Sequence, residues 1–146
     1  MIRSWFVVLV ASLALAACSP APLDFDVSGS LEQPVLTFKR SGGIFRSRAL
    51  CVQAVHVARD GARTFAGMVP DSEAVWRVAA RAGECAPMRR LVYGATVPRM
   101  ATIALPRQLA PGVRYQIWGE AAGGLRGSAV ILFEQGRWNR VSERAA

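Results

Sequence analysis

Short apolar runs interrupted by glycine, proline or aspartate make up most of the chain after residue 34. Runs of this length, bounded by turn residues, are typical of β-strands rather than helices. Turn signals recur along the whole stretch, at Ser41-Gly42-Gly43, Asp60-Gly61, Pro70-Asp71, Gly83, Pro98, Pro106, Pro111-Gly112, Gly123-Gly124 and Gln135-Gly136. This pattern predicts an all-β sandwich or barrel. We expect about seven strands, at residues 35–38, 49–58, 74–80, 91–96, 100–105, 113–120 and 128–135.

Alternation within these runs predicts which side chains face the core. Trp76 and Val78 point to one side of their strand and Arg77 to the other, because successive side chains of a strand alternate. Tyr115 and Ile117 likewise oppose residues 114, 116 and 118. We therefore expect Trp76 and Tyr115 to be buried.

Two runs depart from a simple alternating strand pattern. Residues 129–133 are apolar on both faces, which predicts a central or doubly covered strand. Residues 71–81 also permit a helix capped by Asp71 or Ser72, although the sequence Val75-Trp76-Arg77-Val78 favours a strand.

The segment from Leu109 to Tyr115, with a Pro111-Gly112 turn between them, resembles the tyrosine corner of fibronectin type III and related immunoglobulin-like domains. The resemblance covers about forty C-terminal residues and implies an immunoglobulin-like sandwich. It also implies that the Tyr115 hydroxyl bonds to an upstream backbone group, and Trp76 fits the core tryptophan of such domains. Another β-sandwich can use the same short motif, so that alternative stays open.

The first seventeen residues have the form of an export signal. Arg3 supplies the positive charge, residues 5–15 form the apolar region, and Ala16 and Ala17 are small enough for a cleavage site. A membrane-spanning helix is disfavoured, because the segment is shorter than the roughly 20 apolar residues that a span requires. An ordinary secretory signal remains the competing interpretation.

The run Leu15-Ala16-Ala17-Cys18 resembles the lipobox of bacterial lipoproteins, in which cleavage precedes the cysteine and its thiol is lipidated. The resemblance implies lipidation at Cys18 and membrane attachment through several acyl chains. Ser19, where aspartate would favour the inner membrane, implies the periplasmic face of the outer membrane. Together with Trp76 and residues 91–94, the layout resembles small uncharacterised lipoproteins of proteobacteria. That resemblance implies no particular activity.

This organisation predicts a signal peptide at residues 1–17, a lipidated cysteine and flexible tether at 18–34, and a β-sandwich at 35–146. The tether is rich in proline, serine, glycine and acids, and as a coil it would span on the order of 20 Å. The alternation of Leu23, Phe25 and Val27 leaves an edge strand as the alternative for part of it.

Once Cys18 is lipidated, Cys51 and Cys85 are the remaining cysteines. The exported side of a membrane is oxidising, so the pair is expected to form a disulfide. A zinc site or a reactive thiol is disfavoured, because His56 is the single histidine and there is no CxxC motif. We expect no metal and no cofactor.

Charge gives a weaker indication of the partner. Without Arg3, the chain carries seventeen lysines and arginines against ten carboxylates, a net charge of +7. These basic residues are spread along the chain, which is usually a solvated surface. The functional interpretation is contact with an acidic protein or another anionic envelope component. Nucleic acid would suit the charge, but the expected compartment argues against it.

No catalytic motif is present: there is no GxSxG, HExxH or P-loop, and the glycines at 119, 123, 124 and 127 are interpreted as a hairpin turn. His56 lacks an evident partner, so no catalytic residue is assigned. Trp118 and Trp138 are candidate contact residues.

The favoured hypothesis is a lipid-anchored, non-enzymatic binding module of the envelope. The alternatives are a small envelope hydrolase using His56 and a lysozyme-inhibitor-type lipoprotein.

Overall fold

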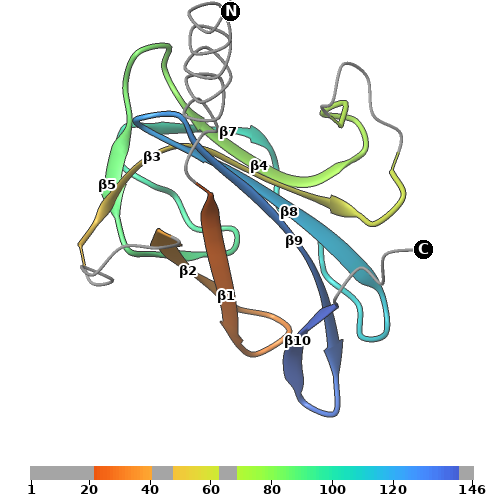
Figure 1. Cartoon of the computed structure of the whole chain (residues 1–146). Helices are drawn as coiled ribbons and strands as arrows, with labels where there is room; N and C mark the ends of the chain where they lie inside the picture. Colours follow the sequence, from red (N-terminus) through yellow and green to blue (C-terminus); the bar gives the residue numbers. More distant parts are fainter. Residues whose placement is uncertain (1–21, 41–47, 63–68, 142–146) are drawn as a thin grey trace, which may run out of the picture.

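The computed structural model describes residues 22–40, 48–62 and 69–141, and every regular element in these ranges is a β-strand (Figure 1). Ten strands form two antiparallel sheets, which pack face to face as a β-sandwich. The predicted all-β class is therefore confirmed. The strands are β1 (Leu23–Gly29), β2 (Pro34–Arg40), β3 (Leu50–Arg59), β4 (Ala74–Ala80), β5 (Ala86–Met88), β6 (Arg90–Val92), β7 (Met100–Ala104), β8 (Arg114–Ala121), β9 (Leu125–Glu134) and β10 (Arg137–Val141).

The smaller sheet has the order β1-β2-β6, and the larger has the order β10-β9-β8-β3-β4-β7, with β5 paired to β3. In immunoglobulin-type sandwiches the first, second and fifth strands share one sheet, and the third strand lies beside the last two in the other. Here β1, β2 and β6 share a sheet, and β3 pairs with β8, which in turn pairs with β9. The sheet pairing thus agrees with the immunoglobulin-like arrangement that the sequence predicts.

The core forms where the two sheets face each other. Trp76 has 0% of its surface exposed, and Tyr115 and Ile117 have 1% each. On β8 the alternate residues 114, 116 and 118 point away from the core and are exposed or half-buried. The predicted orientation of these strands is confirmed, and residues 74–80 form a strand, not a helix.

The tyrosine corner is present. The backbone amide of Ala110 donates a hydrogen bond of 2.9 Å to the Tyr115 hydroxyl, which lies five residues further along the chain. Leu109 is 6% exposed and belongs to the same core cluster as Tyr115. This contact fixes the turn through Pro111 and Gly112 against the start of β8.

The predicted tether is wrong from Leu23 onward, because residues 23–29 form β1 and pair with β2 along its whole length. Leu23 and Phe25 are 3% and 2% exposed. The alternation of apolar side chains therefore outweighs the linker-like composition, because each inward side chain covers the larger sheet. The edge-strand alternative is the correct one, and the domain begins earlier than residue 35.

Two glycines allow β1 to approach the larger sheet closely. Gly119 on β8 faces Gly127 on β9. A Cβ atom at Gly119 would lie 2.6 Å from the Phe25 ring, and one at Gly127 would lie 1.8 Å from the Leu23 carbonyl oxygen. The hairpin interpretation is thus right for Gly123 and Gly124, which connect β8 and β9, and wrong for Gly119 and Gly127.

Candidate functional site

Cys18 lies outside the described residues, so lipidation at this position stays a prediction. The described part of the chain contains no helix that is long and apolar enough to span a bilayer.

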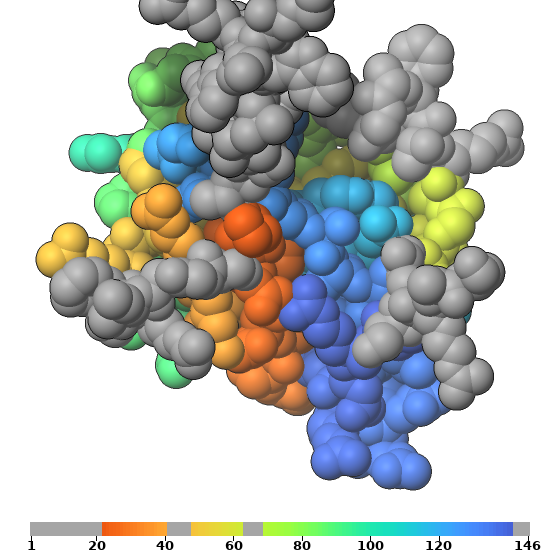
Figure 2. Space-filling view, viewed as in Figure 1, coloured from red at the N-terminus to blue at the C-terminus, as the bar shows by residue number. Residues whose placement is uncertain are grey.

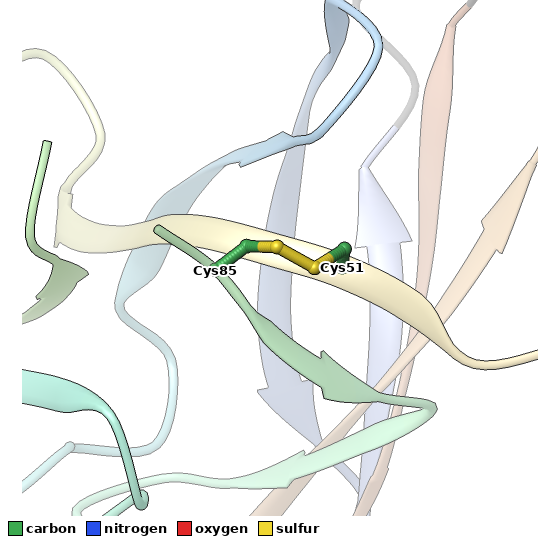
Figure 3. Close-up of a disulfide and its surroundings, with 2 residues drawn as sticks. All are labelled: Cys51 and Cys85. Carbon is green, nitrogen blue, oxygen red and sulfur yellow. A yellow bond between two sulfur atoms is a disulfide. The ribbon is translucent and has the colours of Figure 1, made fainter. Parts of the chain in front are cut away.

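The predicted disulfide between Cys51 and Cys85 is confirmed (Figure 3). Cys51 is the second residue of β3, and Cys85 immediately precedes β5, with 5.2 Å between the two Cα atoms. The register of β3 and β5 places Cys51 opposite Pro87. The bond therefore joins the start of β3 to the segment that returns from β4, and it fixes the short strand β5 beside β3.

His56 lies on the outer face of the larger sheet, directly between Arg77 on β4 and Trp118 on β8. Its ring centroid is 5.4 Å from that of Trp118. Its Nε2 atom is buried and has no hydrogen-bond partner among the described residues. Asp71, the nearby carboxylate, is paired with Arg77 at 2.5 Å instead. Among the described residues, His56 thus has a cationic neighbour and no hydrogen-bonded acid.

The electrostatic environment of His56 disfavours its charged form. Burial lowers the pKa of His56, and the positive charge of Arg77 lowers it further, against a smaller opposing effect of Asp71. This environment therefore favours the neutral form of the ring, which lies against the Trp118 ring.

The two candidate contact tryptophans lie on different surfaces. Trp118 is half-buried on the outer face of the larger sheet, against His56. Trp138 is on β10, packs against Phe133 with ring centroids 5.1 Å apart, and donates its indole N–H to the Ser30 carbonyl at 3.2 Å. The structure does not bring them together into one binding surface.

Trp138 lines a groove of about 360 Å³ where the edge strands β1 and β10 meet. These two edges adjoin on the surface shown in Figure 2. The apolar part of the groove comes from Phe25, Val27 and Ile131. Trp138 also packs against the core, so it closes the open edge of the sandwich.

An ion pair ties the same two edges together. The Arg140 guanidinium lies 2.5 Å from the Asp24 carboxylate. Although burial raises the pKa of Asp24, hydrogen bonds from Arg140 and from the Phe25 amide outweigh it and hold that pKa below its usual value. Asp26 is paired with Lys39 on the neighbouring strand. The charges around this groove are thus satisfied within the domain.

A second and larger groove, of about 500 Å³, lies along β5, β6 and the segment that leads to β7. Met88, Leu91 and Val97 supply apolar surface, and the exposed side chains of Arg90 and Arg99 add positive charge. None of the described residues that line this groove is a carboxylate. Neither arginine forms an ion pair within the described ranges.

Arg99 occupies an unusual backbone position. The amide of Met100 donates to the Val97 carbonyl at 3.1 Å, which closes a tight turn with Pro98 and Arg99 at its centre. Arg99 has a φ of 67°, in the left-handed region. Left-handed backbone costs an ordinary residue about 1–2 kcal/mol, and glycine is usual at such a turn position. An arginine here keeps its charge beside the groove despite that cost.

The groove that contains Arg90 and Arg99, which we call the arginine groove, was not predicted from the sequence. Its two arginines stand nine positions apart, in segments that come together only because β6 pairs with β2 while β7 pairs with β4. Within the sequence they are indistinguishable from the other scattered basic residues.

Comparison with known proteins gives no family for this chain: no family model matches it, and no curated protein matches it.

Proposed function

We propose that the chain is a lipid-anchored envelope protein whose β-sandwich binds an acidic protein or another anionic envelope component, without catalysing a reaction. The observation that carries the binding proposal is the arginine groove. It combines apolar surface with the positive charges of Arg90 and Arg99, and its described lining includes no carboxylate.

The chemistry of the groove favours an anionic partner. A guanidinium presents several N–H donors in one plane and pairs in a bidentate way with carboxylate or phosphate. Because Arg90 and Arg99 have no acidic partner in the described part of the domain, a ligand does not need to displace an existing ion pair. Burial of apolar ligand atoms against Met88 and Leu91 would add to the affinity.

The two alternatives lack comparable support. For a hydrolase, His56 would need a carboxylate partner, yet its strand neighbours are Arg77 and Trp118. For a lysozyme inhibitor, the net charge of +7 is unfavourable, because lysozymes are commonly basic and would be repelled.

Site-specific crosslinking in intact cells tests the binding proposal. A photoreactive residue replaces Val92, which lines the groove and is 40% exposed, in the full-length chain. We expect a discrete adduct whose yield falls by well over tenfold in the Arg90→Gln/Arg99→Gln variant, because each charge-assisted hydrogen bond contributes roughly 1.5–3 kcal/mol.

Two controls make the result specific. The same photoreactive residue at Leu105, which is 78% exposed and outside the groove, should give no such adduct. The Arg59→Gln/Arg137→Gln variant removes two exposed arginines elsewhere and should leave the Val92 adduct unchanged. An adduct that survives the loss of both groove arginines would refute the proposed site.

A further inference from the structure

The distance between Cys18 and the folded domain is short. Pro22 forms a parallel bridge with Arg126, at the start of β9, so the chain is already part of the sandwich at residue 22. Three residues separate Pro22 from Cys18. A fully extended chain advances at most about 3.6 Å per residue, so Cys18 lies within roughly 14 Å of this part of the domain.

That attachment point defines one end of the sandwich, which we call the proximal end. The antiparallel registers show that β1, β3, β7 and β9 begin there and that β2, β4 and β8 end there. The arginine groove opens near this end, because Met88 is paired with Leu50 at the start of β3, and Arg99 directly precedes β7.

The proximal end is strongly basic. Arg48 precedes β3, and six further arginines, all exposed, lie at this end: Arg40, Arg81, Arg89, Arg90, Arg99 and Arg126. The described carboxylates outside β1 at this end are Glu84 and Glu120, and Glu120 lies 3.7 Å from Arg126. Asp24 and Asp26 in β1 are matched by Arg140 and Lys39 and add no net charge.

The opposite, distal end has no such excess. Its described arginines are Arg59, Arg107, Arg114 and Arg137, together with Arg77, whose guanidinium pairs with Asp71. Its described carboxylates are Glu32, Asp60, Asp71, Glu73 and Glu134. The excess positive charge is therefore concentrated at the end from which the chain leads to Cys18.

We propose that the proximal end docks on the anionic phospholipid headgroups of the membrane that holds the anchor, so that the sandwich stands with its distal end facing away from the lipid. This inference rests on the lipid anchor of the proposed function. It adds an orientation and names the phospholipid headgroup layer as the anionic component.

Electrostatics give the expected size of the effect. The attraction of a basic side chain to an anionic lipid surface falls off within about one Debye length, roughly 8 Å at physiological salt. An arginine held near such a surface raises affinity about fivefold. Arginines at the distal end lie beyond that range when the proximal end faces the lipid, so they should contribute little.

Vesicle binding of an unlipidated chain tests the orientation without the anchor. The chain from residue 18 to residue 146 with Cys18→Ser contains every described strand. We expect it to co-sediment with vesicles containing phosphatidylglycerol at low salt, and to be released from them at 0.5 M salt. It should not co-sediment with vesicles of pure phosphatidylcholine.

Two matched double variants locate the surface. Arg40→Gln/Arg81→Gln removes two exposed arginines of the proximal end that form no ion pair with another described residue, and it leaves the groove intact. It should weaken binding about 10- to 30-fold. Arg59→Gln/Arg137→Gln makes the same change in net charge at the distal end and should weaken binding less than twofold. Both variants should keep the wild-type melting midpoint.

Equal losses from the two double variants, or no binding to anionic vesicles, would overturn the docking surface. Neither result would bear on lipidation or on the Val92 crosslink, because this chain lacks the anchor and keeps both groove arginines. Failure of the proposed function is thus distinguishable from failure of the orientation.

Discussion

Replacement of Trp76 by alanine is expected to lower the free energy of unfolding by about 3–5 kcal/mol, because it leaves a large cavity between the sheets. Trp76 is completely buried at the centre of the core, with its ring centroid 5.0 Å from that of Tyr93. The Tyr93 hydroxyl lies 2.9 Å from the Val75 carbonyl and 2.8 Å from the Arg107 carbonyl, so this ring cannot easily move into the space. Urea denaturation followed by circular dichroism measures the loss.

Two further variants give this prediction its controls. Trp118→Ala should cost only about 1–2 kcal/mol, because Trp118 lies half-buried on the outer face of the sheet. Trp76→Phe keeps most of the ring and removes an indole N–H that has no hydrogen-bond partner among the described residues, so it should cost less than Trp76→Ala. Equal destabilisation by Trp76→Ala and Trp118→Ala would contradict the assignment of Trp76 to the core.

Removal of the disulfide should have an effect of similar size. The Cys51→Ala/Cys85→Ala variant opens a loop closed by residues 34 positions apart. In the chain-entropy model a crosslink over this length stabilises the fold by about 4 kcal/mol, through its restriction of the unfolded chain. We expect the denaturation midpoint to fall accordingly, and reduction of the wild-type protein to produce a similar fall.

The pairing itself is checked by mass spectrometry of alkylated, unreduced protein. Alkylation at both Cys51 and Cys85 in the folded chain would show that the bond is absent. A denaturation midpoint unchanged by the double substitution would show that the bond does not contribute to stability.

The sequence predicted the parts of this fold that depend on alternation within one strand. Trp76 and Tyr115 were assigned to the core because arginines occupy the opposite faces of their strands, and both are buried. The tyrosine corner was recognisable because the hydroxyl of Tyr115 reaches the amide of Ala110 within the same short segment. Contacts of this kind depend on residues that are close together in the sequence, so the sequence alone indicates them.

Elements whose structure depends on distant partners were predicted only as an alternative or not at all. Residues 23–29 have the composition of a linker, and they become a strand because Gly119 and Gly127 leave room for Leu23 and Phe25. Strands β5 and β10 are three and five residues long. Strands this short give little periodicity from which to predict them.

In the candidate site, too, one feature was predictable from the sequence and another depends on distant parts of the chain. The disulfide followed from the number of cysteines and the expected compartment, and the structure has it. The groove of Arg90 and Arg99 follows from the path of the chain between the two sheets. Net charge alone gave no indication of where the basic residues gather.

Lipid attachment at Cys18 is the central claim, and intact-mass analysis of protein extracted from the membranes of expressing cells tests it most directly. We expect a mature chain that begins at Cys18 and carries the added mass of its acyl chains. We also expect the Cys18→Ser chain to be lost from the membrane fraction after a carbonate wash. A mature chain that begins elsewhere with an unmodified Cys18 thiol, or a Cys18→Ser chain that stays membrane-bound, would contradict this claim.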